Sequence, residues 1–124
     1  MDPLVERGIE LFNRGAYFEC HEVLEEAWTP ERGPRRVFLQ SLIHVAVGLY
    51  HAERGNPVGA SRQLRKALRK MADFRPWCED IDTASLYRDA EEALQRIEAG
   101  HALAKTIRMK QNAGGRAAGV IANG

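Results

Sequence analysis

The sequence predicts an all-α fold, a compact bundle of about five helices with a central buried helix at about residues 34–54 and a loose C-terminal tail. Apolar residues recur at helical spacing through the first 100 residues. Glycine and proline divide that pattern into segments of ordinary helix length. The segment from Val37 to Ala52 has apolar side chains in nearly every direction around a helix, so other helices should surround it.

The first two helices are expected at residues 3–13 and 16–28. Asp2 is a suitable N-cap for the first, and Pro3 is a favourable first helical residue. Gly15 separates the two helices. The second helix has an apolar stripe at helical spacing, made of Tyr17, Cys20, Leu24, Ala27 and Trp28.

The central helix and the fourth helix are expected at residues 34–54 and 57–73. Pro34 can occupy the first turn of the central helix, and Gly55 ends it. Asn56 is then a structural cap for the fourth helix, because its short polar side chain precedes a proline.

A fifth helix should begin after a loop near Asp82 and end at Gly100. Residues 1–100 are therefore expected to form a single domain. Residues 101–124 are a basic appendage rich in glycine and alanine, and we expect at least the last dozen to be loose.

The composition is that of an ordinary soluble domain, with 44% hydrophobic and 28% charged residues. Residues 1–100 carry 14 basic and 17 acidic side chains, so net charge gives no reason to expect a nucleic-acid partner. The two cysteines do not form a disulfide framework, and the N-terminus lacks the features of a signal peptide. We therefore expect a cytoplasmic protein with no membrane association.

Polar residues within the central helix are the most informative feature. Gln40, His44, Gly48 and His51 follow one line along it, because steps of four and seven residues return to nearly the same direction. Gly48 would let another group approach closely and could seat Trp28 or Tyr17 of the second helix. The line is expected to face that acidic helix, and the imidazole of His44 in particular should point toward it.

The second helix offers partners for these groups. His21 borders its apolar stripe, and Glu25 is its neighbour four residues later, while Glu22 points further toward water. The favoured hypothesis is a structural polar core, since buried polar groups are usually simply satisfied. Its members are His21, Glu22 or Glu25, Gln40 and His44, with Trp28 beside them.

Two forms of chemistry are alternatives to a structural core. One is a divalent metal such as zinc held by His21, Glu25 and His44, with Glu22 as a general base. The other is acid–base catalysis without metal. The second helix reads HEVLE rather than the HExxH of zinc peptidases, so the second imidazole of that motif is missing. We expect no cofactor.

The fourth helix is strongly basic over two turns, through Arg62, Arg65, Lys66, Arg69 and Lys70. Such a helix could track the phosphates of a nucleic acid. A solvated face paired with carboxylates is the favoured interpretation, because no recognition motif accompanies it. The acidic second helix and the basic fourth helix could also attract one another, within one chain or between two.

The strings FNRGAYFECHEVLEEAW and FLQSLIHVAVGLYHAERGNPVGASRQLRKAL resemble the family catalogued as domain of unknown function 309. The family pattern is matched at Phe12, Asn13, Gly15, Tyr17, Cys20, His21, Glu22, Leu24, Glu25, Trp28, Leu39, Gln40, Leu42, Ile43, Gly55, Asn56, Gly59 and Ala60. The resemblance covers about residues 10 to 70. It implies an all-helical bundle of small bacterial and archaeal proteins, and no known activity.

Together these observations favour a non-enzymatic cytoplasmic module that binds a partner or associates with itself as a homodimer. The metal-dependent hydrolase and the nucleic-acid-binding protein are the alternatives.

Overall fold

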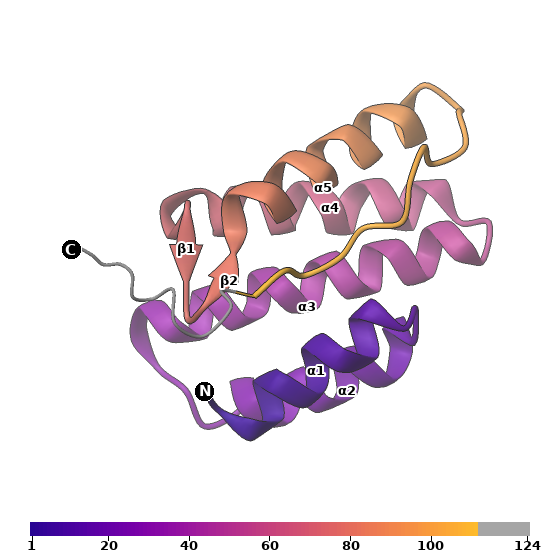
Figure 1. Cartoon of the computed structure of the whole chain (residues 1–124). Coiled ribbons are helices and arrows are strands. Elements are labelled where there is room, and N and C mark those ends of the chain that lie inside the picture. The colour runs from indigo at the N-terminus through magenta and orange to yellow at the C-terminus, as the bar shows by residue number, and fades with distance from the viewer. Residues whose placement is uncertain (112–124) are drawn as a thin grey trace.

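The computed structural model describes residues 1–111, and their fold is the predicted all-helical bundle (Figure 1). The helices are α1 (Pro3–Asn13), α2 (Tyr17–Trp28), α3 (Gly33–Glu53), α4 (Pro57–Met71) and α5 (Thr83–Glu98). A single 3₁₀ turn, Ala72–Phe74, extends α4. Each boundary lies within about two residues of the predicted one, so turn and cap residues determine where these helices begin and end.

The predicted N-caps form as expected. Asp2, Asn56 and Asp82 precede α1, α4 and α5, and each side chain satisfies a backbone N–H group at the start of its helix. The amide groups of Leu4, Gly59 and Ser85 donate to them at 2.8, 3.0 and 2.9 Å. Asn56 is therefore a structural cap.

Each helix packs beside the next one in the chain, and α3 lies in the middle (Figure 1). α1 and α2 lie on one side of it, while α4 and α5 lie on the other. Every residue of α3 from Phe38 to Tyr50 is buried or half-buried, as predicted for the central helix. α5 packs mainly against α4, so it forms the outer edge of the bundle.

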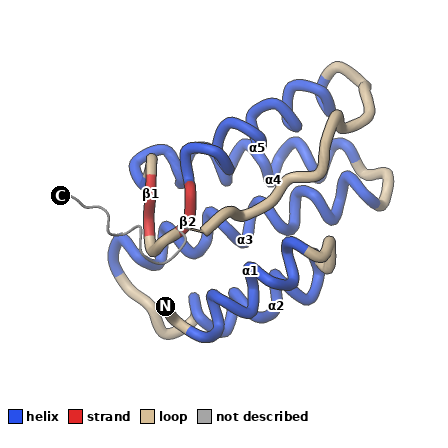
Figure 2. The backbone as a smooth tube through the Cα atoms, viewed as in Figure 1, coloured by secondary structure: helices blue, strands red, loops and turns tan. Residues whose placement is uncertain are grey.

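Residues 101–111 return across the open side of the bundle between α5 and α1 (Figure 2). Ile107 and Met109 are buried there. The Asn13 side chain holds the backbone of Met109 with two hydrogen bonds, donating to its carbonyl oxygen at 3.1 Å and accepting from its N–H at 2.8 Å. This part of the expected tail is thus packed on the bundle. Residues 112–124 lie outside the described part of the chain.

A two-stranded hairpin precedes α5 where the sequence predicted only a loop. Its strands are β1 (Trp77–Cys78) and β2 (Ile81–Asp82). Glu79 and Asp80 form the turn with φ angles of 49° and 65°, the left-handed region that a type I′ hairpin turn requires. Arg35 of α3 holds the turn, because its guanidinium donates to both oxygens of the Glu79 carboxylate at 2.8 and 3.0 Å.

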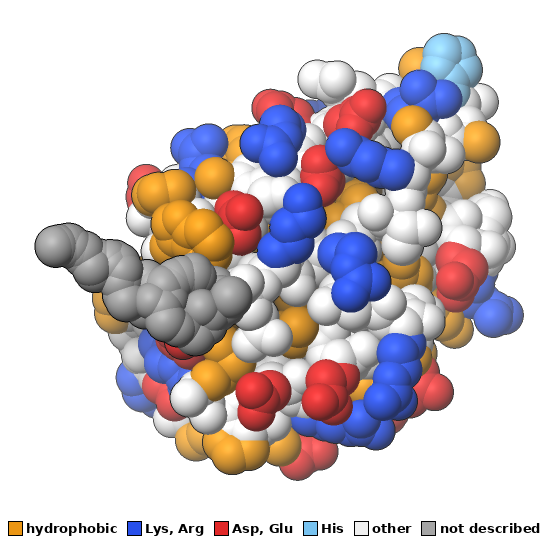
Figure 3. Space-filling view, in the orientation of Figure 1, with side chains coloured by type: hydrophobic (Ala, Val, Ile, Leu, Met, Phe, Trp, Pro, Cys, Tyr) orange, Lys and Arg blue, Asp and Glu red, His pale blue; other side chains and the backbone are white. Residues whose placement is uncertain are grey.

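The face seen in Figure 3 carries basic and acidic side chains interspersed, without a large area of one sign. Within residues 1–111, no helix has the length and apolar character needed to cross a membrane.

Candidate functional site

His21 lies at the border between α2 and α3. Its Nδ1 is 2.7 Å from the carbonyl oxygen of Phe18, which therefore accepts the N–H of this imidazole. Its Nε2 lies 3.7 Å from a carboxylate oxygen of Glu25, so the predicted pair on one flank of the helix forms. The side chain of His21 is only 20% exposed, whereas Glu22 and Glu25 are exposed.

His44 points toward α4. The ammonium of Lys70 can only donate hydrogen bonds, so it donates to His44 Nε2 at 3.1 Å and to the side-chain oxygen of Gln40 at 2.8 Å. The proton of the neutral imidazole is then on Nδ1, which donates to Gln63 Oε1 at 2.7 Å. These four side chains form a network between α3 and α4, which we call the His44 cluster.

The surroundings lower the pKa of both basic groups of the His44 cluster. Burial lowers the pKa of His44, the hydrogen bond to Gln63 opposes this effect, and the positive charge of Lys70 adds to the lowering. Burial also lowers the pKa of Lys70, and the neighbouring charges of Arg69 and Lys66 act in the same direction. The cluster therefore holds a neutral imidazole within a basic surrounding.

The prediction that His44 faces the acidic second helix is therefore wrong. The His44 side chain points from α3 into the space between α2 and α4, where the ammonium of Lys70 donates to it. Its hydrogen bonds go to α4, while His21 and Glu25 pair on α2. The proposed metal ligands His21, Glu25 and His44 are thus divided between two separate groups, and Glu22 is exposed rather than placed as a base. Within the described residues, no three His, Cys, Asp or Glu side chains are close enough to share an ion.

Trp28 lies at the end of α2, away from Gly48. The guanidinium of Arg36 stacks on its ring at 3.7 Å from the ring centroid. Its indole nitrogen is buried and has no hydrogen-bond partner in residues 1–111. Gly48 instead admits α4, since a Cβ at this position would lie 3.0 Å from the Leu64 side chain and 3.4 Å from the carbonyl oxygen of Ala60.

The outward side of α3 forms a strip between α2 and α4, on the side of the helix away from the core. We call it the α3 strip, and its members are Val37, Gln40, His44, Val47 and His51. All are half-buried except Val37, which is 41% exposed. Together with the adjoining flanks of α2 and α4, the α3 strip makes up what we call the α2–α3–α4 face.

An apolar hollow of about 210 Å³ opens between α2 and the α3 strip. It is lined by Tyr17, Phe18, His21, Val47, Tyr50 and His51. Phe18 is 46% exposed at its edge, and its ring lies 5.6 Å from that of Tyr50. An aromatic side chain exposed beside an apolar hollow is typical of a contact surface for another molecule.

The two flanks of the face differ in charge. Outward positions of α2 carry four exposed carboxylates, on Glu19, Glu22, Glu25 and Glu26. On α4, Lys66 and Lys70 lie on the flank that meets α3, whereas Arg65 is turned to α5 and pairs with Glu98. The basic residues of α4 thus point in different directions. The role of Lys70 was not predicted, because the basic residues of this helix were expected to form a solvated face, and no sequence signal singled out Gln63.

Comparisons with known proteins give one family match and two uncharacterized relatives. The family described as "Domain of unknown function (DUF309)" matches residues 5–63. An uncharacterized protein of Bacillus subtilis (strain 168), YpuF, is 34% identical over 85 residues, which are 66% of this chain and 49% of that protein. An uncharacterized protein of Aquifex aeolicus (strain VF5) is 28% identical over 91 residues, which are 73% of this chain and 27% of that protein.

The chain thus matches about half the length of one of these relatives and about a quarter of the other. The match includes α1, α2, α3 and the start of α4, the elements that hold most of the α3 strip and its acidic flank. The resemblance to the DUF309 family is thus confirmed over residues 5–63.

Proposed function

We propose that this protein is a non-enzymatic binding module that associates with a second copy of itself through the α2–α3–α4 face. The observation that carries the proposal is the order of side chains across this face. An acidic flank on α2 and a basic flank on α4 lie on either side of the half-exposed α3 strip. A surface with opposite charges on its two sides can be complementary to itself.

The positions of these charges define the orientation of the pair. A twofold axis parallel to α3 would lay α3 on α3 and place the α2 of each copy over the α4 of the other. An axis across α3 would instead set like charges against one another, α2 over α2. Like charges in contact are unfavourable, so we favour the first arrangement.

The acidic residues of α2 and the basic residues of α4 also lie at matching positions along the α3 axis. Lys70 bonds Gln40, so this end of α4 lies beside the first half of α3. Trp28 contacts Arg36, so the C-terminal turn of α2 lies beside the same part of α3. Glu25 is one turn before Trp28, and Lys66 is one turn before Lys70. In the proposed pair, Glu25 of one copy therefore lies near Lys66 of the other.

Charge reversal tests the proposal. Glu25→Lys or Lys66→Glu alone should weaken self-association, measured by sedimentation velocity over a concentration series. The double variant should restore it, because the attraction is re-formed with its signs exchanged. Glu91→Lys is the matched control, since Glu91 is an exposed carboxylate on α5 and outside the face.

A monomeric mass at every concentration would contradict self-association, as would a double variant no better than the single ones. Salt-sensitive binding of duplex DNA that Arg69→Glu weakens would assign the basic flank to a nucleic acid instead.

A cytoplasmic location is part of the proposal. Burial raises the pKa of the Cys20 thiol to about 12, and it also raises the pKa of Cys78. Both cysteines are free, as is usual for proteins of a reducing compartment. Fractionation of the native cells would check this location, and recovery in an extracellular fraction would contradict it.

A further inference from the structure

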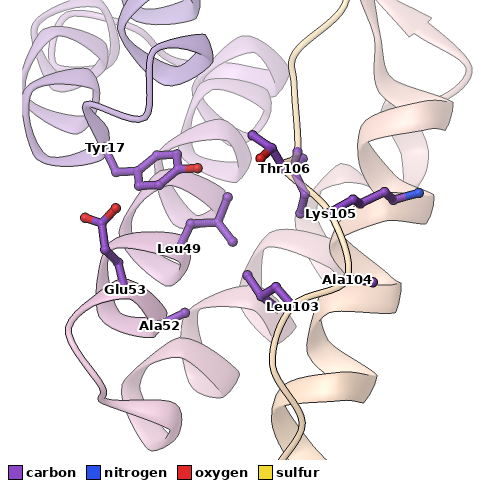
Figure 4. A pocket seen from close by; sticks show the side chains of 9 residues that line it. Tyr17, Leu49, Ala52, Glu53, Leu103, Ala104, Lys105 and Thr106 are labelled. Carbon is purple, nitrogen blue, oxygen red and sulfur yellow. The ribbon is translucent and has the colours of Figure 1, made fainter.

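A second cavity lies between the last turns of α3 and the returning segment (Figure 4). Its volume is about 460 Å³, the size of a small-molecule site. The walls are the first turn of α2, the last turns of α3 and the returning segment 103–107. The lining residues are Tyr17, Leu49, Ala52, Glu53 and residues 103–107.

The wall formed by the returning segment is fixed in place. Ile107 is buried, and the backbone of Met109 is held by Asn13. Lys105 is anchored to α5, since its ammonium lies 3.0 Å from the Asp89 carboxylate. The cavity is thus formed before any ligand arrives, which lowers the entropy that binding must overcome.

The charged groups around this cavity leave it with negative character. Figure 4 shows the Tyr17 ring projecting into the cavity with its hydroxyl toward Thr106, while the Glu53 carboxylate lies near the base of the same side chain. Lys105 points away from the cavity. Its ammonium is within 3.0 and 3.3 Å of Asp89 and Glu92, so its charge is already matched by carboxylates.

Glu53, in contrast, forms no ion pair within residues 1–111. Burial raises the pKa of the Tyr17 hydroxyl, and the negative charge of Glu53 raises it further. The field of this carboxylate therefore reaches the hydroxyl inside the cavity. An anion would be repelled here, and a cation would be attracted.

The floor of the cavity is apolar. Leu49 and Ile107 are buried beneath it, and Ala52 and Leu103 line it. Ala52 and Leu103 also line an adjoining hollow of about 280 Å³ that continues toward Ile97. The two hollows share Ala52 and Leu103, and we call them together the groove, with the Glu53 carboxylate at one end and Ile97 at the other.

We propose that this groove binds an aliphatic ammonium compound, with its charged head between the Glu53 carboxylate and the Tyr17 hydroxyl oxygen. Its alkyl chain lies over Ala52 and Leu103. The ammonium supplies donors to two acceptors, and the chain covers apolar surface that is otherwise in contact with water. The charged group of this site lies apart from the α3 strip, because Leu49 and Glu53 occupy the other side of α3, while Tyr17 lines both hollows.

The test uses hexylammonium as the probe, followed by the amide signals of the ¹⁵N-labelled full chain at pH 7. We expect saturable shifts in residues 103–107. Glu53→Gln should weaken binding by at least about tenfold, the effect of losing one charged hydrogen bond. Glu91→Gln, on the exposed side of α5, is the matched control and should bind like the wild type.

Hexanol and hexanoate are the ligand controls, because they keep the chain but replace the positive head. Both should bind at least tenfold more weakly than hexylammonium. Equal binding of hexanoate, an unchanged affinity in Glu53→Gln, or no saturable shift with millimolar hexylammonium would each overturn the proposal. Glu53 is exposed and forms no ion pair within residues 1–111, so the Glu53→Gln variant should fold like the wild type. Its amide spectrum reports directly whether it does.

Discussion

Replacing Asn13 with alanine should loosen the returning segment and lower the stability of the whole domain. The Asn13 side chain makes two hydrogen bonds with the backbone of Met109, at 3.1 and 2.8 Å. Each bond contributes about 0.5–1.5 kcal/mol, so their loss should cost about 1–3 kcal/mol. Alanine also has the higher helix propensity at the end of α1, which offsets roughly 0.5 kcal/mol.

The expected net loss for Asn13→Ala is therefore about 0.5–2.5 kcal/mol, or a decrease of roughly 2–10 °C in Tm. Urea unfolding followed by circular dichroism at one protein concentration measures the free energy of unfolding. Hydrogen exchange supplies the local readout, because the Met109 amide loses its acceptor and should exchange faster. Arg14→Ala is the control, since Arg14 is exposed at the adjacent position.

An Asn13→Ala protein within about 0.5 kcal/mol of wild type, with unchanged protection of the Met109 amide, would refute this reasoning. The returning segment would then be held by the burial of Ile107 and Met109 and by the ion pairs of Lys105.

Three further predictions concern the packing, the pH dependence and the hairpin. Gly48→Leu should lower the free energy of unfolding by about 2 kcal/mol or more in urea titration, because Leu64 and Ala60 occupy the space that the new side chain needs. Because burial lowers the pKa of folded His44, the unfolded chain binds protons first, so stability should fall as pH decreases below about 6.5. His44→Gln should flatten this part of the pH profile. Asp80→Gly should raise the free energy of unfolding by about 0.5–1 kcal/mol, because glycine adopts the positive φ of this position without strain. A thermal scan should show this as a higher Tm.

The helix boundaries could be predicted because their signals are local. Asp2, Asn56 and Asp82 cap helices through backbone amides three residues away or fewer, so the sequence contains both partners. The central position of α3 was predictable for a similar reason, since apolar residues on nearly all sides of one helix require neighbours.

The partners of His44 were not predictable in this way. Helical spacing gives the direction of a side chain relative to its own helix, but it does not say which neighbouring helix lies in that direction. Lys70 reaches His44 across 26 residues of sequence, and a lysine on a basic helix is usually solvated. Only the tertiary structure shows that a neutral histidine lies beside this lysine.

The hairpin and the returning segment were missed for different reasons. Strands of two residues have no periodicity to detect, and Glu79–Asp80 is not a favoured type I′ turn sequence. In the returning segment, only Ile107 and Met109 are buried, and the Met109 backbone bonds Asn13, which is 96 residues away along the chain.

Chemical cross-linking tests the proposed pairing of α3 with α3 most directly. On a Cys78→Ser background, Val37→Cys places a thiol on the α3 strip, while Cys20 remains buried. Because the twofold axis is parallel to α3, the two copies of this thiol should lie close together, and a short bismaleimide should give a covalent dimer. Val58→Cys, at a position that is 66% exposed and outside the α2–α3–α4 face, should stay monomeric. Equal cross-linking of both variants, or none of Val37→Cys, would contradict the pairing.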